Sequence, residues 1–125
     1  MDINFLVVDD SPTMRRIVIN TLKRLGYRSI EEADNGQTAL DKLKTTEGIN
    51  FIVTDWNMPV MDGLTFVKTV RSSPEFADIP ILIVTTRSVK DDIIEAMKSG
   101  VNNYVVKPFT PEIMKSKIET ILSNL

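Results

Sequence analysis

The sequence contains no cysteine and no histidine, and it has a single tryptophan. The first two absences exclude disulfides, thiolate nucleophiles, imidazole bases and zinc sites built from Cys or His ligands. Any metal bound by this protein must therefore be held by oxygen atoms.

The sequence also lacks long apolar runs and an excess of basic charge. Its first residues, MDINFLVVDDSP, reach two carboxylates after a short apolar run and have no basic flank, unlike a signal peptide. No apolar stretch approaches the roughly 18 residues of a membrane span. The net charge of −2 argues against nucleic-acid binding, because phosphate backbones are bound mainly by an excess of Lys and Arg. We expect a cytoplasmic protein with no membrane insertion and no nucleic-acid partner.

The length of 125 residues is typical of a single domain, and the content of 42% hydrophobic and 26% charged residues is that of a globular protein. No repeat, low-complexity tract or linker divides the chain. We therefore expect one domain over residues 1–125 with no second domain.

Short β-rich runs alternate with segments of helical periodicity along the whole chain. The expected strands are residues 4–8 (NFLVV), 28–32 (RSIEE), 51–54 (FIVT), 81–85 (ILIVT) and 103–106 (NYVV). This alternation predicts a parallel sheet with helices on both faces, and the polar second strand belongs at an edge. The prediction is a doubly wound (βα)5 fold of the flavodoxin-like type, a five-stranded parallel sheet with strand order 2-1-3-4-5.

Capping residues mark the expected helices. Ser11 and Pro12 start the first and Thr110 and Pro111 the last, while Ser88 resembles the start of a capping box in the fourth. The apolar faces predicted to be buried are Met14, Ile17, Val18, Thr21, Leu22 and Leu25; Ala39, Leu40 and Leu43; Leu64, Val67 and Val70; Val89, Ile93, Ile94 and Met97; and Met114, Ile118, Ile121, Leu122 and Leu125.

Polar side chains follow four of the five strands, and the carboxyl ends of parallel strands meet at one edge of the sheet. The residues at these positions are Asp9 and Asp10, then Asp55, Trp56 and Asn57, then Thr85 and Thr86, and finally Lys107 and Pro108, and all but Trp56 and Pro108 are polar. Three carboxylates brought together would repel one another unless a cation shared the site, and Mg²⁺ prefers oxygen ligands. Such a site suits phosphoryl transfer, with Asp55 as nucleophile, Lys107 as cationic clamp and Thr85 as hydroxyl partner.

Four motifs resemble the receiver domains of response regulators over nearly the whole chain. They are LVVDDS at residues 6–11, TDWNMPVMDG at 54–63, IVTT at 83–86 and YVVKPF at 104–109. The resemblance implies a two-component regulator with no output domain, which accepts a phosphoryl group from a sensor histidine kinase on Asp55. Such a domain has autophosphotransfer and autodephosphorylation activity that depends on magnesium, but it is not an enzyme in the ordinary sense.

The resemblance also implies a role for each site residue. Asp10 would bind Mg²⁺ directly and Asp9 through water, with Asp55 and the backbone carbonyl of Asn57 as further ligands. Thr85 and Lys107 would bind the phosphoryl oxygens. The peptide bond between Lys107 and Pro108 is expected to be cis.

Within the family, the chain is similar to single-domain chemotaxis regulators, since it combines DWNMP, Tyr104 and KPF. This implies that Thr85 and Tyr104 form a switch, and that the target is the flagellar motor switch protein. The expected partner face contains Lys90, Ile93, Tyr104, Val106 and Lys117. Alternatively, Tyr104 is a half-buried core tyrosine without a switching role, and Lys90 and Lys117 are ordinary solvated charges on helices. A dedicated phosphatase is a further implied partner, and the domain is expected to be a monomer.

One residue departs from the chemotaxis pattern. In chemotaxis regulators the second residue after the switch threonine is often acidic, whereas here it is Arg87. Arg87 and Asn57 should flank the route of the attacking water, so the sequence does not fix the lifetime of the phosphorylated state. Three alternative functions also remain. An aspartyl phosphatase would carry an acid in place of Asn57, and a flavin or nucleotide binder would carry a Gly- or Ser-rich loop in place of Asp9 and Asp10. A phosphorelay intermediate or another single-domain regulator would share the same site.

Overall fold

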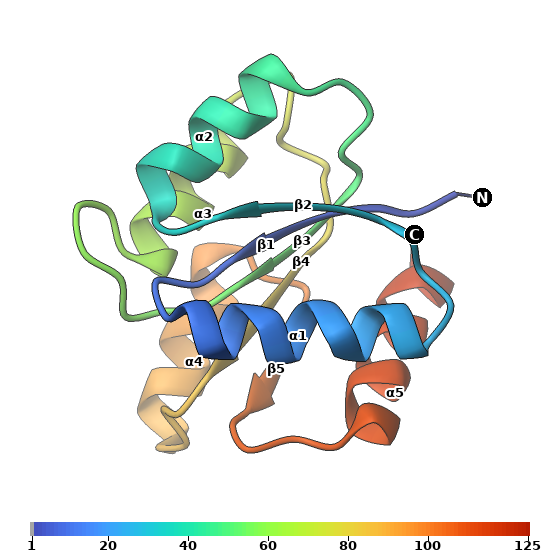
Figure 1. Ribbon diagram of the computed structural model, residues 1–125. Coiled ribbons are helices and arrows are strands. Elements are labelled where there is room, and N and C mark those ends of the chain that lie inside the picture. Colours follow the sequence, from blue (N-terminus) through green and yellow to red (C-terminus); the bar gives the residue numbers. More distant parts are fainter. Residues whose placement is uncertain (1) are drawn as a thin grey trace.

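The computed structural model describes residues 2–125, in which five strands alternate with five helices (Figure 1). The strands are β1 (Asn4–Val8), β2 (Ser29–Ala33), β3 (Phe51–Thr54), β4 (Ile81–Thr85) and β5 (Asn103–Val106). The helices are α1 (Pro12–Arg24), α2 (Gly36–Thr45), α3 (Gly63–Ser72), α4 (Lys90–Ser99) and α5 (Pro111–Ser123). None of these helices has the length and apolar character needed to cross a membrane.

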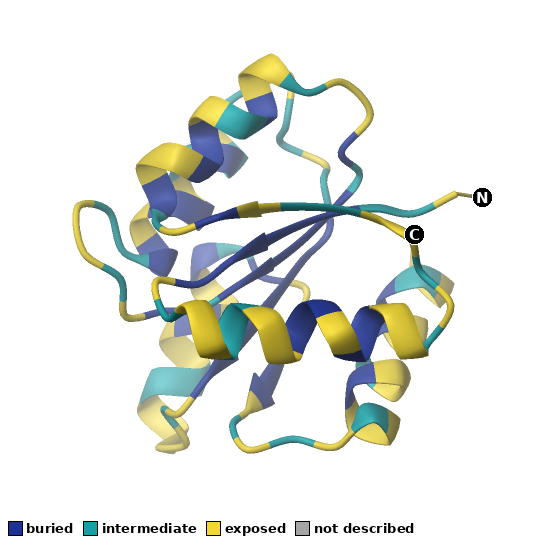
Figure 2. Ribbon diagram, in the orientation of Figure 1, coloured by how far each residue is buried: buried dark blue, intermediate teal, exposed yellow. Residues whose placement is uncertain are grey.

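All strand pairs are parallel, and the strand order is β2-β1-β3-β4-β5. The predicted (βα)5 fold and its strand order are therefore confirmed. The polar strand β2 lies at an edge, as predicted, and begins one residue later than expected. Central strands are buried on both faces because helices cover both, whereas β2 exposes Ser29 and Glu32 (Figure 2).

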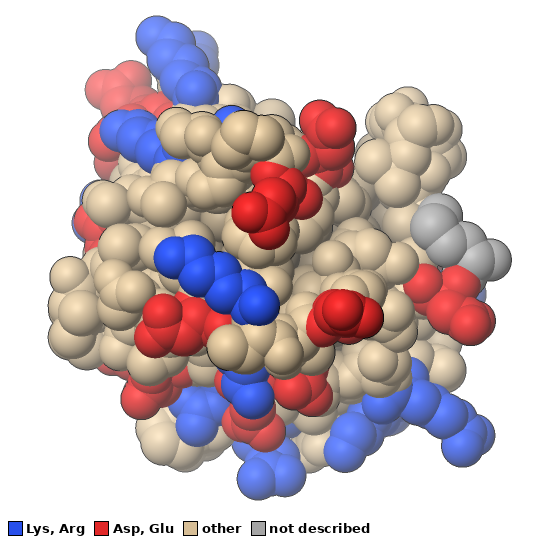
Figure 3. Space-filling model, turned by 90° about the horizontal axis from the view of Figure 1, so that it is seen from above, with Lys and Arg blue, Asp and Glu red and all other residues tan. Residues whose placement is uncertain are grey.

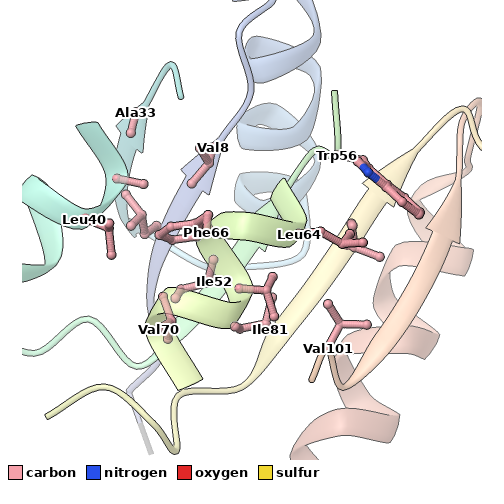
Figure 4. Packing of buried hydrophobic residues seen from close by; sticks show 14 of the residues in the cluster. Val8, Ala33, Leu40, Ile52, Trp56, Leu64, Phe66, Val70, Ile81 and Val101 are labelled. Atoms are coloured by element: carbon pink, nitrogen blue, oxygen red, sulfur yellow. The ribbon is translucent and has the colours of Figure 1, made fainter. Parts of the chain in front are cut away.

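Successive residues of each central strand point to opposite faces of the sheet and pack into two separate hydrophobic cores. Phe5 and Val7 of β1 pack with α1 and α5, while Leu6 and Val8 pack with α2, α3 and α4. Figure 4 shows part of the core formed with α2, α3 and α4, where Phe66 and Leu64 of α3 lie over the sheet and Trp56 lies near Leu64. The sheet is thus fixed from both sides, so the carboxyl ends of its strands are held in constant register.

The predicted caps of the first and last helices are confirmed. The Ser11 hydroxyl accepts a hydrogen bond from the Met14 N–H at 3.2 Å, and the Thr110 hydroxyl accepts one from the Ile113 N–H at 3.2 Å. Each helix then has Pro in its first turn, where the missing N–H removes no intrahelical bond.

The prediction for α4 was partly wrong. Its cap position is Val89, which makes no side-chain cap bond, and Ser88 precedes it, so the expected capping box does not form. The reason lies in the preceding loop, where backbone contacts of Arg87 with Thr85 and Tyr104 delay the start of the helix.

Several apolar side chains predicted to be buried are instead exposed. The helix α4 buries only Ala96 and Ser99, because it covers the sheet with a narrow stripe near the edge strand β5. The exposed residues are Val89, Ile94 and Met97 at α4, Ile17 on α1 and Leu125 after α5.

Candidate functional site

The site forms at the carboxyl ends of β1, β3 and β5. The ladder continues past the strands, since the Asp9 N–H donates to the Ala33 carbonyl at 3.1 Å and the Asp55 N–H to the Val8 carbonyl at 2.9 Å. These bonds fix the backbone of both aspartates, so their side chains leave the sheet at neighbouring positions.

Lys107 joins the two buried carboxylates. Its Nζ lies 3.0 Å from Asp9 Oδ2 and 3.3 Å from Asp55 Oδ2. The side chains of Lys107, Asp9 and Asp55 are only 9%, 4% and 13% exposed, respectively, so water screens this ion pair weakly. The lysine thus ties the end of β5 to β1 and β3.

The remaining carboxylate oxygens accept backbone hydrogen bonds or face solvent. Asp9 Oδ1 accepts from the Ser11 N–H at 2.9 Å, and Asp55 Oδ1 accepts from the Trp56 N–H at 2.7 Å. Asp10 is exposed and contributes the third carboxylate, and one oxygen from each of Asp9, Asp10 and Asp55 lies within 4.8 Å of the others. The predicted convergence of these residues is confirmed.

The charges of this cluster are unbalanced. Burial raises the pKa of Asp55, the Lys107 ammonium partly offsets this, and repulsion from Asp9 raises the pKa further. One ammonium ion cannot balance three carboxylates, so the oxygen cluster suits a divalent cation that prefers oxygen ligands. The residues present therefore fit Mg²⁺, which prefers such oxygen ligands.

The loop after Asp55 depends on a glycine that sequence reasoning missed. A Cβ atom on Gly63 would lie 2.1 Å from the Asp55 carbonyl oxygen, and the Gly63 N–H donates to the Trp56 carbonyl at 2.7 Å. The loop from 55 to 63 thus folds back on itself. The MDG motif at residues 61–63 was the available signal.

Thr85 and Lys107 are placed by the pairing of β4 with β5. Thr85 is fully buried, and its carbonyl accepts a hydrogen bond from the Lys107 N–H at 2.8 Å. The peptide bond between Lys107 and Pro108 is cis, as the resemblance implied. The hydroxyl and the ammonium therefore extend from adjacent strands at the same edge of the sheet.

Arg87 contacts the two residues that follow Asp55 in the chain. Its guanidinium carbon is 4.2 Å from the centre of the Trp56 ring, and its Nη2 donates to Asn57 Oδ1 at 2.8 Å. Trp56, expected at the polar rim, is only 4% exposed and belongs to the core. The sequence pointed to Arg87 but gave no signal of this stacking, which depends on side-chain geometry.

Tyr104 is buried, with 7% of its surface exposed, and its hydroxyl donates to the Arg87 carbonyl. Burial raises the pKa of this hydroxyl, as does the nearby Asp92, while Arg87 opposes them. Of the other residues expected on the partner face, Lys90 and Val106 are exposed, and Ile93 and Lys117 are half-buried. They come from α4, β5 and α5.

Residues 5–119 match the family model of the response regulator receiver domain. The fold and the acidic site thus define a phospho-acceptor regulator and not an enzyme in the ordinary sense. The chain belongs to the response regulator receiver family.

The similarities extend to chemotaxis proteins. The chain is 53% identical over 119 residues to chemotaxis protein CheY1 of Helicobacter pylori, covering 95% of this chain and 96% of that protein. It is 52% identical over 119 residues to the CheY homologue of Campylobacter jejuni, covering 95% and 92% of the two chains. These matches assign the receiver to the CheY type of chemotaxis response regulator, activated by phosphorylation in two-component signalling.

Solved structures show the same architecture. The structure of chemotaxis protein CheY4 from Vibrio cholerae superposes with a TM-score of 0.87 at 36% identity, covering 97% of this chain and 99% of that chain. A receiver domain of a histidine kinase from Syntrophus aciditrophicus superposes with a TM-score of 0.86 at 27% identity, covering 98% and 91%.

Proposed function

We propose that Asp55 accepts a phosphoryl group from a sensor histidine kinase and that this modification switches binding to the flagellar motor switch protein. The observation that carries the proposal is the convergence of Asp9, Asp10 and Asp55, two of which, Asp9 and Asp55, pair with Lys107. The similarity to chemotaxis proteins supports the target.

Asp9, Asp10, Asp55 and the carbonyl of Asn57 would hold Mg²⁺. The exposed carboxylate of Asp10 is suited to direct coordination, whereas both oxygens of Asp9 already accept hydrogen bonds from Ser11 and Lys107. When bound, the ion neutralises the carboxylates and the oxygens of the incoming phosphoryl group.

The protein's own groups prepare Asp55 for attack. A carboxylate oxygen of Asp55 forms a bond to phosphorus while the bond between phosphorus and the donor breaks, and the electron pair leaves with the donor. Lys107 already contacts Asp55, so its ammonium can stay with the phosphoryl oxygens throughout. Thr85, at the end of the adjacent strand β4, would supply its hydroxyl to the same oxygens.

The output of this reaction would be a binding event. The added charge near Thr85 and Lys107 favours whichever conformation satisfies it, and Tyr104 would report that change to the surface. The partner face would comprise Lys90, Ile93, Tyr104, Val106 and Lys117. We further propose that the domain acts as a cytoplasmic monomer and that a dedicated phosphatase ends the signal.

Intact-mass spectrometry after incubation with acetyl phosphate and Mg²⁺ tests the first step. We expect one added phosphoryl group in the wild type, none in Asp55→Asn, and loss of the reaction with EDTA. The exposed Asp2→Asn is the matched control and should react as the wild type does. Equal phosphorylation of Asp55→Asn would contradict the proposal.

A pull-down with the N-terminal peptide of the flagellar motor switch protein tests the target. Phosphorylation should strengthen binding, and Lys90→Ala and Lys117→Ala should weaken it. Phosphotransfer onward to a second histidine protein, without peptide binding, would instead indicate a phosphorelay intermediate or a regulator outside chemotaxis.

A further inference from the structure

The side chain of Arg87 makes contacts with two different parts of the molecule. On one side, its guanidinium contacts the two residues that follow Asp55: it stacks on Trp56 and donates to Asn57 Oδ1 at 2.8 Å. The other side faces α4, where Nη1 lies 3.7 Å from Asp92 Oδ1. A single cation therefore bridges the site and the first turn of this helix.

The start of α4 has no capping side chain, unlike the starts of the other four described helices. Within residues 2–125, the other four helices begin with a side chain that accepts a backbone hydrogen bond, namely Ser11, Asn35, Asp62 and Thr110. The cap position of α4 is Val89, which cannot make such a bond. With no capping bond, the first turn of α4 has the contact of Arg87 with Asp92 as its side-chain link to the preceding loop.

The guanidinium also has an unused hydrogen-bond donor. Its Nε is buried and has no hydrogen-bond partner among the described residues. The pair with Asp92 is long and both side chains are about one-third exposed (37% and 30%), so it is weak and easily exchanged. Arg87 can therefore bind a stronger anion without breaking a strong interaction.

We propose that Arg87 is a charge-operated latch, which holds the first turn of α4 at the site until a phosphoryl group on Asp55 draws its guanidinium away from Asp92. This inference rests on the proposed phosphorylation of Asp55. A phosphoryl group carries about −1.5 to −2 charges and binds arginine in bidentate geometry, so it outcompetes the single, partly exposed carboxylate of Asp92.

The latch links the site to the proposed partner face. The residues released with the first turn of α4 include Lys90 and Ile93, and the Arg87 carbonyl also accepts the hydroxyl of Tyr104. Movement of Arg87 would thus reach the helix and the tyrosine together. A protein that binds the partner face would therefore contact an α4 whose first turn is released in the phosphorylated protein.

Hydrogen exchange followed by mass spectrometry tests the latch in the full chain. In the unphosphorylated protein, Arg87→Ala and Asp92→Asn should each raise exchange of the peptide spanning residues 86–97 by about threefold to fivefold, the scale of one weak polar contact. The double variant should exchange no faster than Arg87→Ala, because that variant has already lost the contact with Asp92. The control is Arg28→Ala, an exposed arginine in the loop before β2.

The second part of the experiment repeats the exchange measurement after phosphorylation with acetyl phosphate and Mg²⁺. Phosphorylation should raise exchange of the same peptide in the wild type by a similar factor, and by less than twofold in Arg87→Ala. Asp92→Asn keeps the stacking on Trp56 and serves if Arg87→Ala fails to fold, as checked by Trp56 fluorescence. Arg87→Lys should show an intermediate response, since it keeps the charge but loses the planar fork.

The outcomes separate the two proposals. Complete phosphorylation by intact mass with unchanged exchange of residues 86–97 would overturn the latch alone, as would additive effects of Arg87→Ala and Asp92→Asn. Absence of any phosphoryl group would overturn the proposed function and, with it, the release step.

Discussion

The surroundings of Asp55 disfavour the ionised form of its carboxyl group. It is mostly buried and close to Asp9, and Lys107 compensates only partly, so its pKa is raised. In buffer without divalent ions, Asp55→Asn should increase the free energy of unfolding at neutral pH, because the amide carries no charge for burial and Asp9 to disfavour. Urea denaturation monitored by Trp56 fluorescence measures this, with Asp2→Asn as the control. A less stable Asp55→Asn would contradict the interpretation.

The pH dependence follows from the same raised pKa. A carboxyl group whose pKa is higher in the folded state contributes stability below its unfolded pKa and loses it as pH rises through the folded pKa. The stability of the wild type relative to Asp55→Asn should therefore fall as pH rises from about 4 toward neutrality. Denaturation of both proteins across this range checks the sign, and a rising difference would refute it.

Val60 is a second residue in an unfavourable setting. Its φ of 67° lies in the left-handed region, which β-branched residues rarely adopt, and its side chain is 83% exposed. Val60→Gly should raise the free energy of unfolding by about 0.5–1 kcal/mol, since relief of strain exceeds the added chain entropy. Val60→Ala keeps a Cβ atom and should give a smaller change. Thermal unfolding of the three proteins compares them.

At the scale of elements, Arg71 holds two connections together. From the end of α3, its guanidinium donates to the carbonyls of Gly100, Ala77 and Ile79, at 3.0, 2.9 and 2.7 Å. It also donates to Asn102 Oδ1, which accepts the Ile81 N–H at the start of β4. The loops before β4 and β5 thus share one clamp.

Loss of this clamp should destabilise the fold. Arg71→Ala is expected to lower the free energy of unfolding by about 2–3 kcal/mol, because several partly buried carbonyls lose a charged donor. The exposed Arg16→Ala should change it by less than about 0.5 kcal/mol. Urea denaturation of both variants distinguishes the effects, and equal values would show that Arg71 is dispensable.

Strands and most helices could be predicted because local chemistry determines them. Buried parallel strands require continuous apolar residues such as those of β3 and β4, and Ser11 with Pro12 favours a helix start in any context. The helix α4 could not be predicted fully, since its start depends on contacts of Arg87 with residues distant in sequence. Its exposed Ile94 and Met97 have the periodicity of a buried face, but only tertiary packing decides which face is covered.

The site could be predicted to a similar extent. Parallel strands bring their carboxyl ends together, so Asp9, Asp55, Thr85 and Lys107 could be placed at one edge from their positions after the strands. The stacking of Arg87 on Trp56 and the close approach of Gly63 to the Asp55 carbonyl depend on loop geometry. No periodicity in the sequence encodes that geometry.

At the scale of the whole molecule, acidic and basic side chains are interspersed, as the face in Figure 3 shows, and the acidic cluster is a local excess of charge. Mg²⁺ should therefore stabilise the fold by binding there, by about 2.7 kcal/mol at a hundredfold excess over its Kd. Denaturation with and without Mg²⁺ measures the gain. Asp10→Asn should lose most of it, and the exposed Asp41→Asn should retain it.

The described chain begins, from residue 2, at the amino side of the sheet, where α1 and α5 also end, while the carboxyl ends of the strands point the opposite way (Figure 1). A fluorescent reporter or surface tether attached at either terminus would consequently leave the cluster of Asp9, Asp10 and Asp55 accessible to ions and kinases. Immobilised protein should keep its full phosphorylation capacity, which makes the domain convenient for sensor construction.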